Sequence, residues 1–196
     1  MAHQRVTRGT GLLEGFLARA RARRADALIS SDLRGGRILD IGCGSTPYFL
    51  AHTSFKEKFA IDQSHPAEAG DIRWHALDLN RSPEIPFEDG FFSAVTMLAV
   101  IEHLNPASLV RLFQESHRVL APGGVVVLTT PASWSNGLLK TMAMVNLVSA
   151  EEIDEHVFTY TLPLLGWYFG KAGFAMERVR FGYFQMMLNL WATAHK

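Results

Sequence analysis

The sequence predicts an α/β fold built on a mainly parallel sheet, and three observations support this prediction. From Gly35 onward, short apolar runs typical of buried strands alternate with segments of helical periodicity. The first run, Arg37–Ile41, leads through a glycine turn into a helix start, as in a strand–turn–helix unit. At 196 residues and 48% hydrophobic, the chain can form one substantial core. We find no repeat, low-complexity tract or second domain in it.

Residues 1–34 are predicted to form a basic amphipathic helix ahead of a single domain, residues 35–196. Eight of the 19 Lys and Arg lie before residue 38, but only three of the 19 Asp and Glu do. Apolar residues recur there at helical spacing, with Arg19, Arg21 and Arg23 largely between them. We expect a packed helix with solvated arginines. The alternative interpretations of this segment are a transit peptide, a membrane-surface helix, a nucleic-acid-binding surface and a site that binds a phosphate-bearing or acidic substrate.

The remaining elements follow from periodicity and from turn signals. Asn105 and Pro106 are typical of a helix start, and Pro122-Gly123-Gly124 is typical of the connection after that helix. Only about ten residues join the second and third strands, so the usual crossover helix is expected to be reduced or absent. Residues 174–196 predict two strands with a bend near Gly182. The expected strands are Arg37–Ile41, Lys58–Ile61, Ile72–Ala76, Phe92–Ala99 and Gly124–Thr130, and the expected helices are Ser45–His52, Pro106–Leu120 and Leu162–Ala172.

The turn after the first strand predicts a ligand site. Gly42 and Gly44 carry no Cβ, so the backbone can turn tightly and approach a ligand closely. In an open α/β sheet, such a turn borders a nucleotide-like ligand. Asp40 would repel a pyrophosphate there but would attract an ammonium group. Pro47 fills the third small-residue position of the dinucleotide fingerprint G-x-G-x-x-G/A. Both mismatches argue against a dinucleotide-dependent dehydrogenase.

Seven short blocks stand in a fixed order along the chain. They are Ile38–Pro47, Ala60–Asp62, Ala76–Leu79, Phe91–Val95, Ile101–Leu104, Arg118–Gly124 and Lys171–Phe174. Together they resemble the class I S-adenosylmethionine-dependent methyltransferases, in particular their small type 11 domains. The resemblance runs from about residue 37 to residue 196. It implies a Rossmann-like, doubly wound, mainly parallel seven-stranded sheet with an antiparallel C-terminal hairpin, and a cap formed by the N-terminal helix.

The resemblance implies S-adenosylmethionine as cofactor and S-adenosylhomocysteine as product. Asp40 would lie near the aminoacyl end of the cofactor, Asp62 would accept hydrogen bonds from the ribose diol, and Asp78 would meet the adenine amino group. As structural alternatives, Asp40 could cap the turn and Asp78 could belong to an ordinary loop. Cys43 is interpreted as a small packing residue rather than a nucleophile. The predicted cofactor-binding residues are Asp40, Gly42, Cys43, Gly44, Asp62, Gln63, Asp78, Leu79 and Leu98.

The predicted reaction is in-line methyl transfer to a small or lipid- or sugar-like acceptor. His103 and His156 are the candidates for a general base, because histidine titrates near neutrality, with a structural role as the alternative for each. No metal is predicted, because Ala99 stands where some members of the resembled family carry a metal-binding glutamate. An apolar insertion at about 132–160 is expected to form a lid. A catalytically silent cofactor-binding module is the alternative function.

Composition also predicts the cellular compartment and the kind of binding partner. The single cysteine, Cys43, excludes an internal disulfide and predicts a reducing cytoplasm. No apolar run is long enough to span a bilayer. A small-molecule substrate is expected, whereas nucleic acid is not, because nucleic-acid binding usually needs a broad basic surface. The sequence leaves the oligomeric state and the acceptor atom open.

Overall fold

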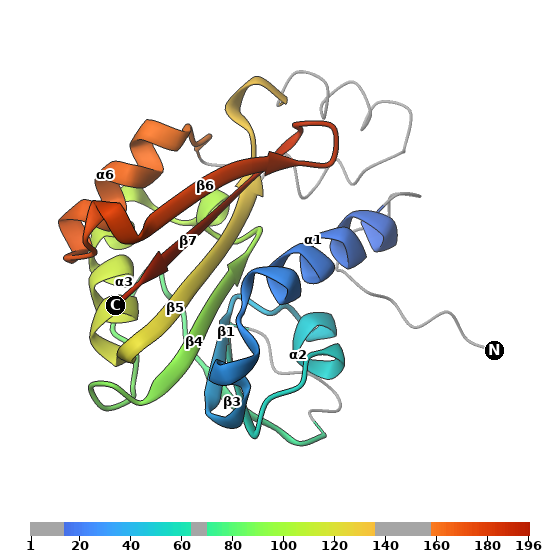
Figure 1. Ribbon diagram of the computed structural model, residues 1–196, viewed down its shortest axis with the longest axis vertical. Coiled ribbons are helices and arrows are strands. Elements are labelled where there is room, and N and C mark those ends of the chain that lie inside the picture. Colours follow the sequence, from blue (N-terminus) through green and yellow to red (C-terminus); the bar gives the residue numbers. More distant parts are fainter. Residues whose placement is uncertain (1–13, 64–69, 136–157) are drawn as a thin grey trace.

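The structure is a computed structural model that describes residues 14–63, 70–135 and 158–196. Its centre is a seven-stranded sheet with the strand order β3-β2-β1-β4-β5-β7-β6 (Figure 1). The first five strands in this order are parallel, and β7 runs antiparallel to both β5 and β6. The predicted mainly parallel sheet with an antiparallel C-terminal hairpin is therefore confirmed. The strands are β1 (Arg37–Ile41), β2 (Glu57–Asp62), β3 (Ile72–Ala76), β4 (Phe92–Leu98), β5 (Leu120–Pro131), β6 (Val179–Phe184) and β7 (Asn189–His195).

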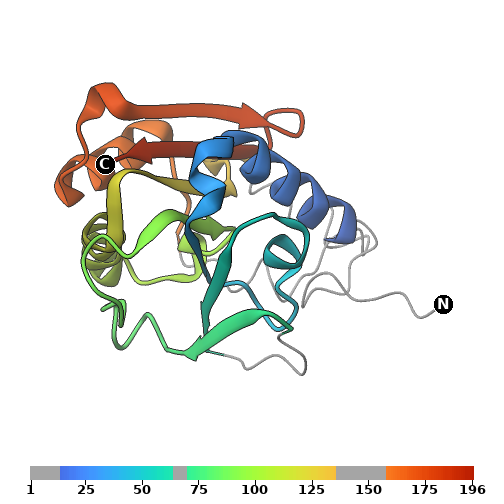
Figure 2. The same ribbon diagram turned by 60° about the horizontal axis from the view of Figure 1, so that its bottom comes forward.

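Helices cover both faces of the sheet (Figures 1 and 2). The α-helices among the described residues are α1 (Glu14–Leu28), α2 (Tyr48–His52), α3 (Pro106–Val119) and α6 (Leu162–Ala172), and the 3-10 helices are η1 (Ser31–Gly35), η2 (Ile101–His103), η3 (Ser133–Ser135) and η4 (Met176–Arg178). Ile38 of β1 packs in one apolar cluster with α1 and α2, whereas Leu39 packs in a second cluster with α3 and α6. Neighbouring residues of β1 thus fill opposite cores, as the period-two alternation of a strand requires.

Two helix ends agree closely with the sequence signals. The Asn105 side chain caps α3 by accepting a hydrogen bond from the Ala107 amide at 3.0 Å. At α6, the Thr161 hydroxyl caps the start and Gly173, with φ +99°, ends the helix, so the predicted bounds are exact. α2 is shorter than predicted, because its first helical residue is Tyr48 and the residues before it extend the glycine turn.

The predicted bend near Gly182 is wrong. Gly182 lies inside β6 opposite Trp191 of β7, and a Cβ there would stand 2.4 Å from the indole nitrogen. The glycine therefore makes room for an aromatic ring rather than a turn. The turn itself lies at Gln185, Met186 and Met187, which all have positive φ, between 51° and 67°. None of these three residues is a usual turn signal.

The connection between β2 and β3 runs without a helix through the residues that the structure describes, which are Gln63 and residues 70–71. Its residues 64–69 lie outside the described ranges. β5 begins at Leu120, earlier than predicted, because Leu120 pairs with Phe92 ahead of the glycine pair at 123–124. None of the helices in the described ranges is long and apolar enough to cross a bilayer.

The strand order reverses between β1 and β4, which is where the fold places a ligand. From β1 the chain proceeds outward to β2 and β3, then crosses to β4 on the other side of β1. The carboxyl ends of all five parallel strands meet at one edge of the sheet. In open α/β sheets, ligands bind outside the carboxyl ends at such a reversal.

Candidate functional site

The two glycines after β1 have different surroundings. Gly42 and Gly44 both have positive φ, 71° and 68°, a backbone conformation that favours glycine. A Cβ on Gly42 would stand 2.4 Å from the Val100 side chain, so this glycine allows the turn after β1 to pack against the turn after β4. Among the residues that the structure describes, a Cβ on Gly44 would meet nothing within 4 Å. Gly44 therefore presents its backbone to open space, as a close-approaching ligand requires.

Asp62 joins the end of β2 to this turn. Its Oδ2 accepts a hydrogen bond from the Gly44 amide at 2.8 Å, and the Gly42 amide donates to the Ile61 carbonyl at 2.7 Å. Asp62 is mostly buried, with 9% of its surface exposed. The fold thus brings together a carboxylate and an open glycine backbone, as the sequence predicted for a ribose-binding acid and its neighbouring turn. The ribose contact itself stays a prediction.

Asp40 is a buried acid that links two strands. It is 3% exposed, and its Oδ1 accepts a hydrogen bond from Thr96 Oγ1 at 2.6 Å, across the register pair of β1 and β4. Burial raises the pKa of Asp40 to about 7; the Thr96 hydrogen bond opposes this rise, and the negative charge of Asp62 adds to it. Within the described residues, the Asp40 carboxyl is thus bonded to β4 rather than to the glycine turn. Its surroundings favour a positively charged neighbour.

Asp78 is engaged in the local structure of its own loop. Its Oδ1 accepts hydrogen bonds from the Asn80 amide at 3.0 Å and from Gln63 Nε2 at 3.3 Å. Its Oδ2 lies 3.4 Å from Arg81 Nε. These contacts fit the ordinary-loop interpretation of Asp78. An adenine contact by Asp78 or Gln63 stays a prediction.

The remaining predicted cofactor residues are apolar or small. Leu79 is 5% exposed and packs in the core, whereas Leu98 is half-buried at the end of β4. Cys43 is half-buried, packs against the cluster under α1 and α2, and its Sγ lies 3.7 Å from the Gly44 carbonyl oxygen. These contacts agree with the packing role expected of Cys43. Contacts of Leu79 and Leu98 with a cofactor stay predictions.

On the other side of the strand reversal, η2 carries Glu102 and His103. Glu102 is 2% exposed, and its Oε2 accepts a hydrogen bond from Thr130 Oγ1 at 3.0 Å. Burial raises the pKa of Glu102, whereas His103, local hydrogen bonds and Arg21 lower it. His103 is half-buried in the same turn, and His156 lies outside the described residues. Glu102 is not among the residues predicted for the site from the sequence, although its position just after a parallel strand was a signal for such a role.

Ala99, which precedes η2, has a φ of +57°, unusual for a residue with a Cβ. Within the described ranges, no three His, Cys, Asp or Glu side chains converge as a metal site. The predicted independence from metal stays a prediction.

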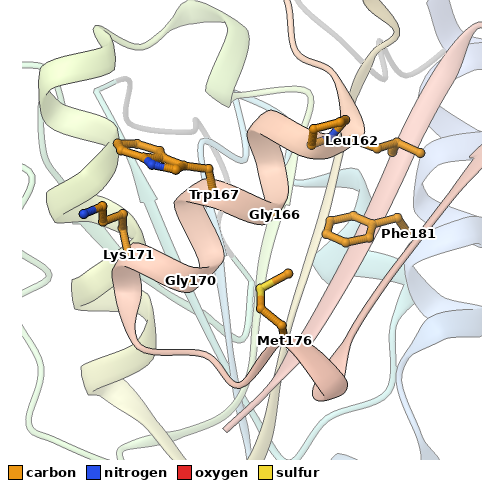
Figure 3. A pocket seen from close by; sticks show the side chains of 8 residues that line it. Leu162, Gly166, Trp167, Gly170, Lys171, Met176 and Phe181 are labelled. Atoms are coloured by element: carbon orange, nitrogen blue, oxygen red, sulfur yellow. The ribbon is translucent and has the colours of Figure 1, made fainter.

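A groove of about 760 Å³ lies elsewhere, between α6, η4 and the edge strand β6 (Figure 3). Trp167 and Lys171 stand on one side of it, and Met176 and Phe181 on the other. Its lining includes none of the predicted site residues. The groove is therefore separate from the candidate site at the carboxyl ends of the parallel strands.

Comparison with known proteins gives a consistent result. A family model described as a methyltransferase domain matches residues 11–179. No curated protein matches the chain. A SAM-dependent methyltransferase from Archaeoglobus fulgidus superposes with a TM-score of 0.71 at 17% identity, over 92% of this chain and 94% of that one.

Two further solved structures are similar to this chain. An S-adenosylmethionine-dependent methyltransferase from Mesorhizobium loti has a TM-score of 0.65 at 18% identity, over 92% of this chain and 100% of that one. Phosphoethanolamine N-methyltransferase 2 from Haemonchus contortus, solved with phosphomonomethylethanolamine and S-adenosylhomocysteine, has a TM-score of 0.65 at 16% identity, over 90% of this chain and 52% of that one. At these identities the similarities establish the fold.

Proposed function

The chain belongs to the methyltransferase domain family, and on this premise we propose that it transfers a methyl group from S-adenosylmethionine to a small or lipid- or sugar-like acceptor. The observation that carries the proposal is the hydrogen bond from the Gly44 amide to Asp62 at 2.8 Å, beside open space at Gly44. This hydrogen bond places the Asp62 carboxylate next to a backbone segment that a ligand can approach, at the point where the strand order reverses.

The residues at this edge fit the proposed cofactor. Asp62 offers acceptor atoms suited to a ribose diol, and Gly44 leaves room for close approach. Asp40, buried beside Thr96, would gain a compensating charge from the ammonium group of the aminoacyl end. A pyrophosphate would instead bring more negative charge to the pair of Asp40 and Asp62. The same two acids thus favour this cofactor over a dinucleotide.

The chemical demands on the protein are modest. When bound, S-adenosylmethionine supplies a methyl group already activated by the positive charge on sulfur. The chain's own residues must hold the acceptor atom in line and keep water away. Where the acceptor atom carries a proton, His103 beside Glu102 is our proposed base, with His156 as the second candidate. Replacing each histidine separately by alanine tests this assignment, because undiminished turnover removes that residue from the role.

We propose a small-molecule acceptor and a reducing cytoplasm as the setting. The lone Cys43, half-buried beside the glycine turn, supports the second proposal, since the protein needs no oxidising compartment to form disulfides. Turnover of small acceptors without any added protein or nucleic acid would support the first. A strict requirement for either macromolecule would overturn it.

Calorimetry tests the cofactor assignment. S-adenosylmethionine and S-adenosylhomocysteine should bind the wild type, NAD should not, and Asp62→Ala should weaken both adenosyl ligands by about tenfold or more. Asp62→Asn keeps an oxygen that can accept the hydrogen bond of the Gly44 amide. This variant therefore separates the effect of losing the ribose contact from the effect of losing the contact with Gly44. Asp71→Ala, at an exposed position just before β3, removes the same charge, and this variant should bind normally.

Two results would contradict the proposal. Binding of NAD without either adenosyl ligand would overturn the cofactor assignment. Binding of adenosyl ligands without methyl transfer to any member of a broad acceptor panel would favour a catalytically silent module.

A further inference from the structure

Glu102 is a buried carboxylate that the fold leaves partly uncompensated. It is 2% exposed, and Thr130 satisfies its Oε2 at 3.0 Å. Its Oε1 is buried and has no hydrogen-bond partner among the described residues. A buried polar atom without a partner costs free energy, more so when it belongs to a charged group. Such an atom in a native structure needs an explanation.

The position of Glu102 points to the acceptor side of the site. η2 follows β4 directly, and Thr130 lies near the end of β5. Glu102 therefore stands at the carboxyl edge across the strand reversal from Asp62, which lies at the end of β2. Because the proposed cofactor would occupy the edge near β1 and β2, the edge near β4 and β5 is left for the acceptor.

The groups around Glu102 determine which kind of ligand group could donate a hydrogen bond to its Oε1. Tyr160 donates its hydroxyl proton to the Ile101 carbonyl at 3.0 Å, so it does not serve Glu102. Arg21 of α1 acts on Glu102 through space, yet Arg21 makes no ion pair within the described ranges. His103, in the same turn, also acts on Glu102 through space, more strongly than Arg21 does. An anionic acceptor group would be repelled by the carboxylate, whereas a protonated amine would supply both a donor and a compensating charge.

We propose that the methyl acceptor carries an amino group and that this group donates a hydrogen bond to Glu102 Oε1. The inference deepens the proposed function and rests on it for the identity of the site. It assigns Glu102 as the residue that recognises the acceptor's amine. Arg21 of α1, which acts on Glu102 through space, would accommodate an anionic group elsewhere on the same acceptor.

The competing explanation is structural. In that case Glu102 only ties η2 to β5 through Thr130, and a glutamine would do this equally well, because its side-chain oxygen can also accept the Thr130 hydrogen bond. Glu102→Gln therefore separates the two explanations. It keeps the contact to Thr130, removes the charge, and is expected to fold because it relieves a buried carboxylate.

The test compares matched amine and hydroxyl probes on the protein saturated with S-adenosylhomocysteine. The pairs are 2-phenylethylamine with 2-phenylethanol, ethanolamine with ethylene glycol, and phosphoethanolamine with ethylene glycol monophosphate, each titrated by ligand-observed NMR. We expect the amine of at least one pair to bind wild type about tenfold more tightly than its hydroxyl counterpart. Glu102→Gln should abolish that preference, and Glu177→Gln, an exposed change of the same charge in η4, should retain it.

Two outcomes overturn the proposal. One is a wild type with no preference for the amine in any pair, a comparison that needs no variant to fold. The other is a folded Glu102→Gln protein that keeps the preference. S-adenosylhomocysteine binding, measured first on each sample, reports separately on the proposed function, so loss of that binding is not confused with loss of amine recognition.

Discussion

Asp40 Oδ1 and Thr96 Oγ1 lie 2.6 Å apart, and their hydrogen bond ties β1 to β4 where the strand order reverses. This contact holds a carboxyl group that is 3% exposed and has a pKa raised to about 7. The protein thus keeps an acid in a place where the ionised form is unfavourable without a cation. Folding without cofactor therefore favours the neutral form of Asp40, whereas binding of an ammonium group favours its ionised form.

The first prediction concerns stability without cofactor. Between the unfolded pKa near 3.8 and the folded pKa near 7, the folded state binds the Asp40 proton more tightly, so this residue makes stability fall as the pH rises. Asp40→Asn removes that loss. It should raise the free energy of unfolding at pH 8 by roughly 2–4 kcal/mol, with the difference shrinking toward pH 4. Denaturant unfolding at several pH values measures this, and a less stable variant at pH 8 would contradict it.

The second prediction concerns cofactor affinity against pH. An ammonium group prefers the ionised form of Asp40, whose population falls as the pH drops below about 7. The affinity of wild type for S-adenosylhomocysteine should decrease roughly tenfold from pH 7.5 to pH 6. Asp40→Asn should bind more weakly at pH 7.5 and show a flatter profile. Equal pH profiles for the two proteins by calorimetry would remove Asp40 from the ammonium site.

The third prediction separates the two glycines of the turn. Gly42→Ala meets Val100 at 2.4 Å and should destabilise the protein by about 1–3 kcal/mol. The methyl group of Gly44→Ala meets no atom of the described residues within 4 Å, so its cost in stability should be near 1 kcal/mol, from the positive φ alone. Its loss of S-adenosylhomocysteine affinity should be the larger effect, about tenfold or more. Thermal unfolding and calorimetry on both variants check this, and unchanged affinity in Gly44→Ala would place the ligand elsewhere.

The fourth prediction concerns the C-terminal hairpin. Gly182→Ala should destabilise the protein by about 1–3 kcal/mol, because the new methyl group would collide with Trp191. Met186→Gly should instead stabilise it by up to about 1 kcal/mol, because Met186 is 91% exposed and has a φ of +55°. Denaturant midpoints compare the two. If Gly182→Ala stabilised the protein and Met186→Gly destabilised it, the result would contradict this account of the hairpin and would favour Gly182 as the turn residue.

Much of the fold could be predicted because its signals are local. The cap and terminal glycine of α6 lie next to the helix in sequence, and the alternation of β1 reports directly on two buried faces. The hairpin turn could not be predicted, because Gln185–Met187 take positive φ without a glycine, an asparagine or an aspartate. The early start of β5 depends on a pairing between Leu120 and Phe92, which are far apart in sequence.

The candidate site was predicted in part for the same reason. The glycine turn and Asp62 follow strands that the sequence marks clearly, and the fold brings them together at 2.8 Å. That Glu102 Oε1 has no hydrogen-bond partner in the described part of the chain could not be predicted, since this depends on which side chains of α1, β5 and residues 158–161 reach η2. The contact of Asp78 with Gln63 is likewise set by tertiary geometry, whereas its contact with the Asn80 amide, two residues away, belongs to the local loop that the sequence allowed for.

A crystal structure of the protein with S-adenosylhomocysteine tests the central claim most directly. We predict the ribose hydroxyls within hydrogen-bond distance of the Asp62 carboxylate, the ammonium group beside Asp40, and the ligand against the open backbone of Gly44. A ligand bound in the groove between α6 and β6, or touching neither Asp40 nor Asp62, would contradict the assignment of the site.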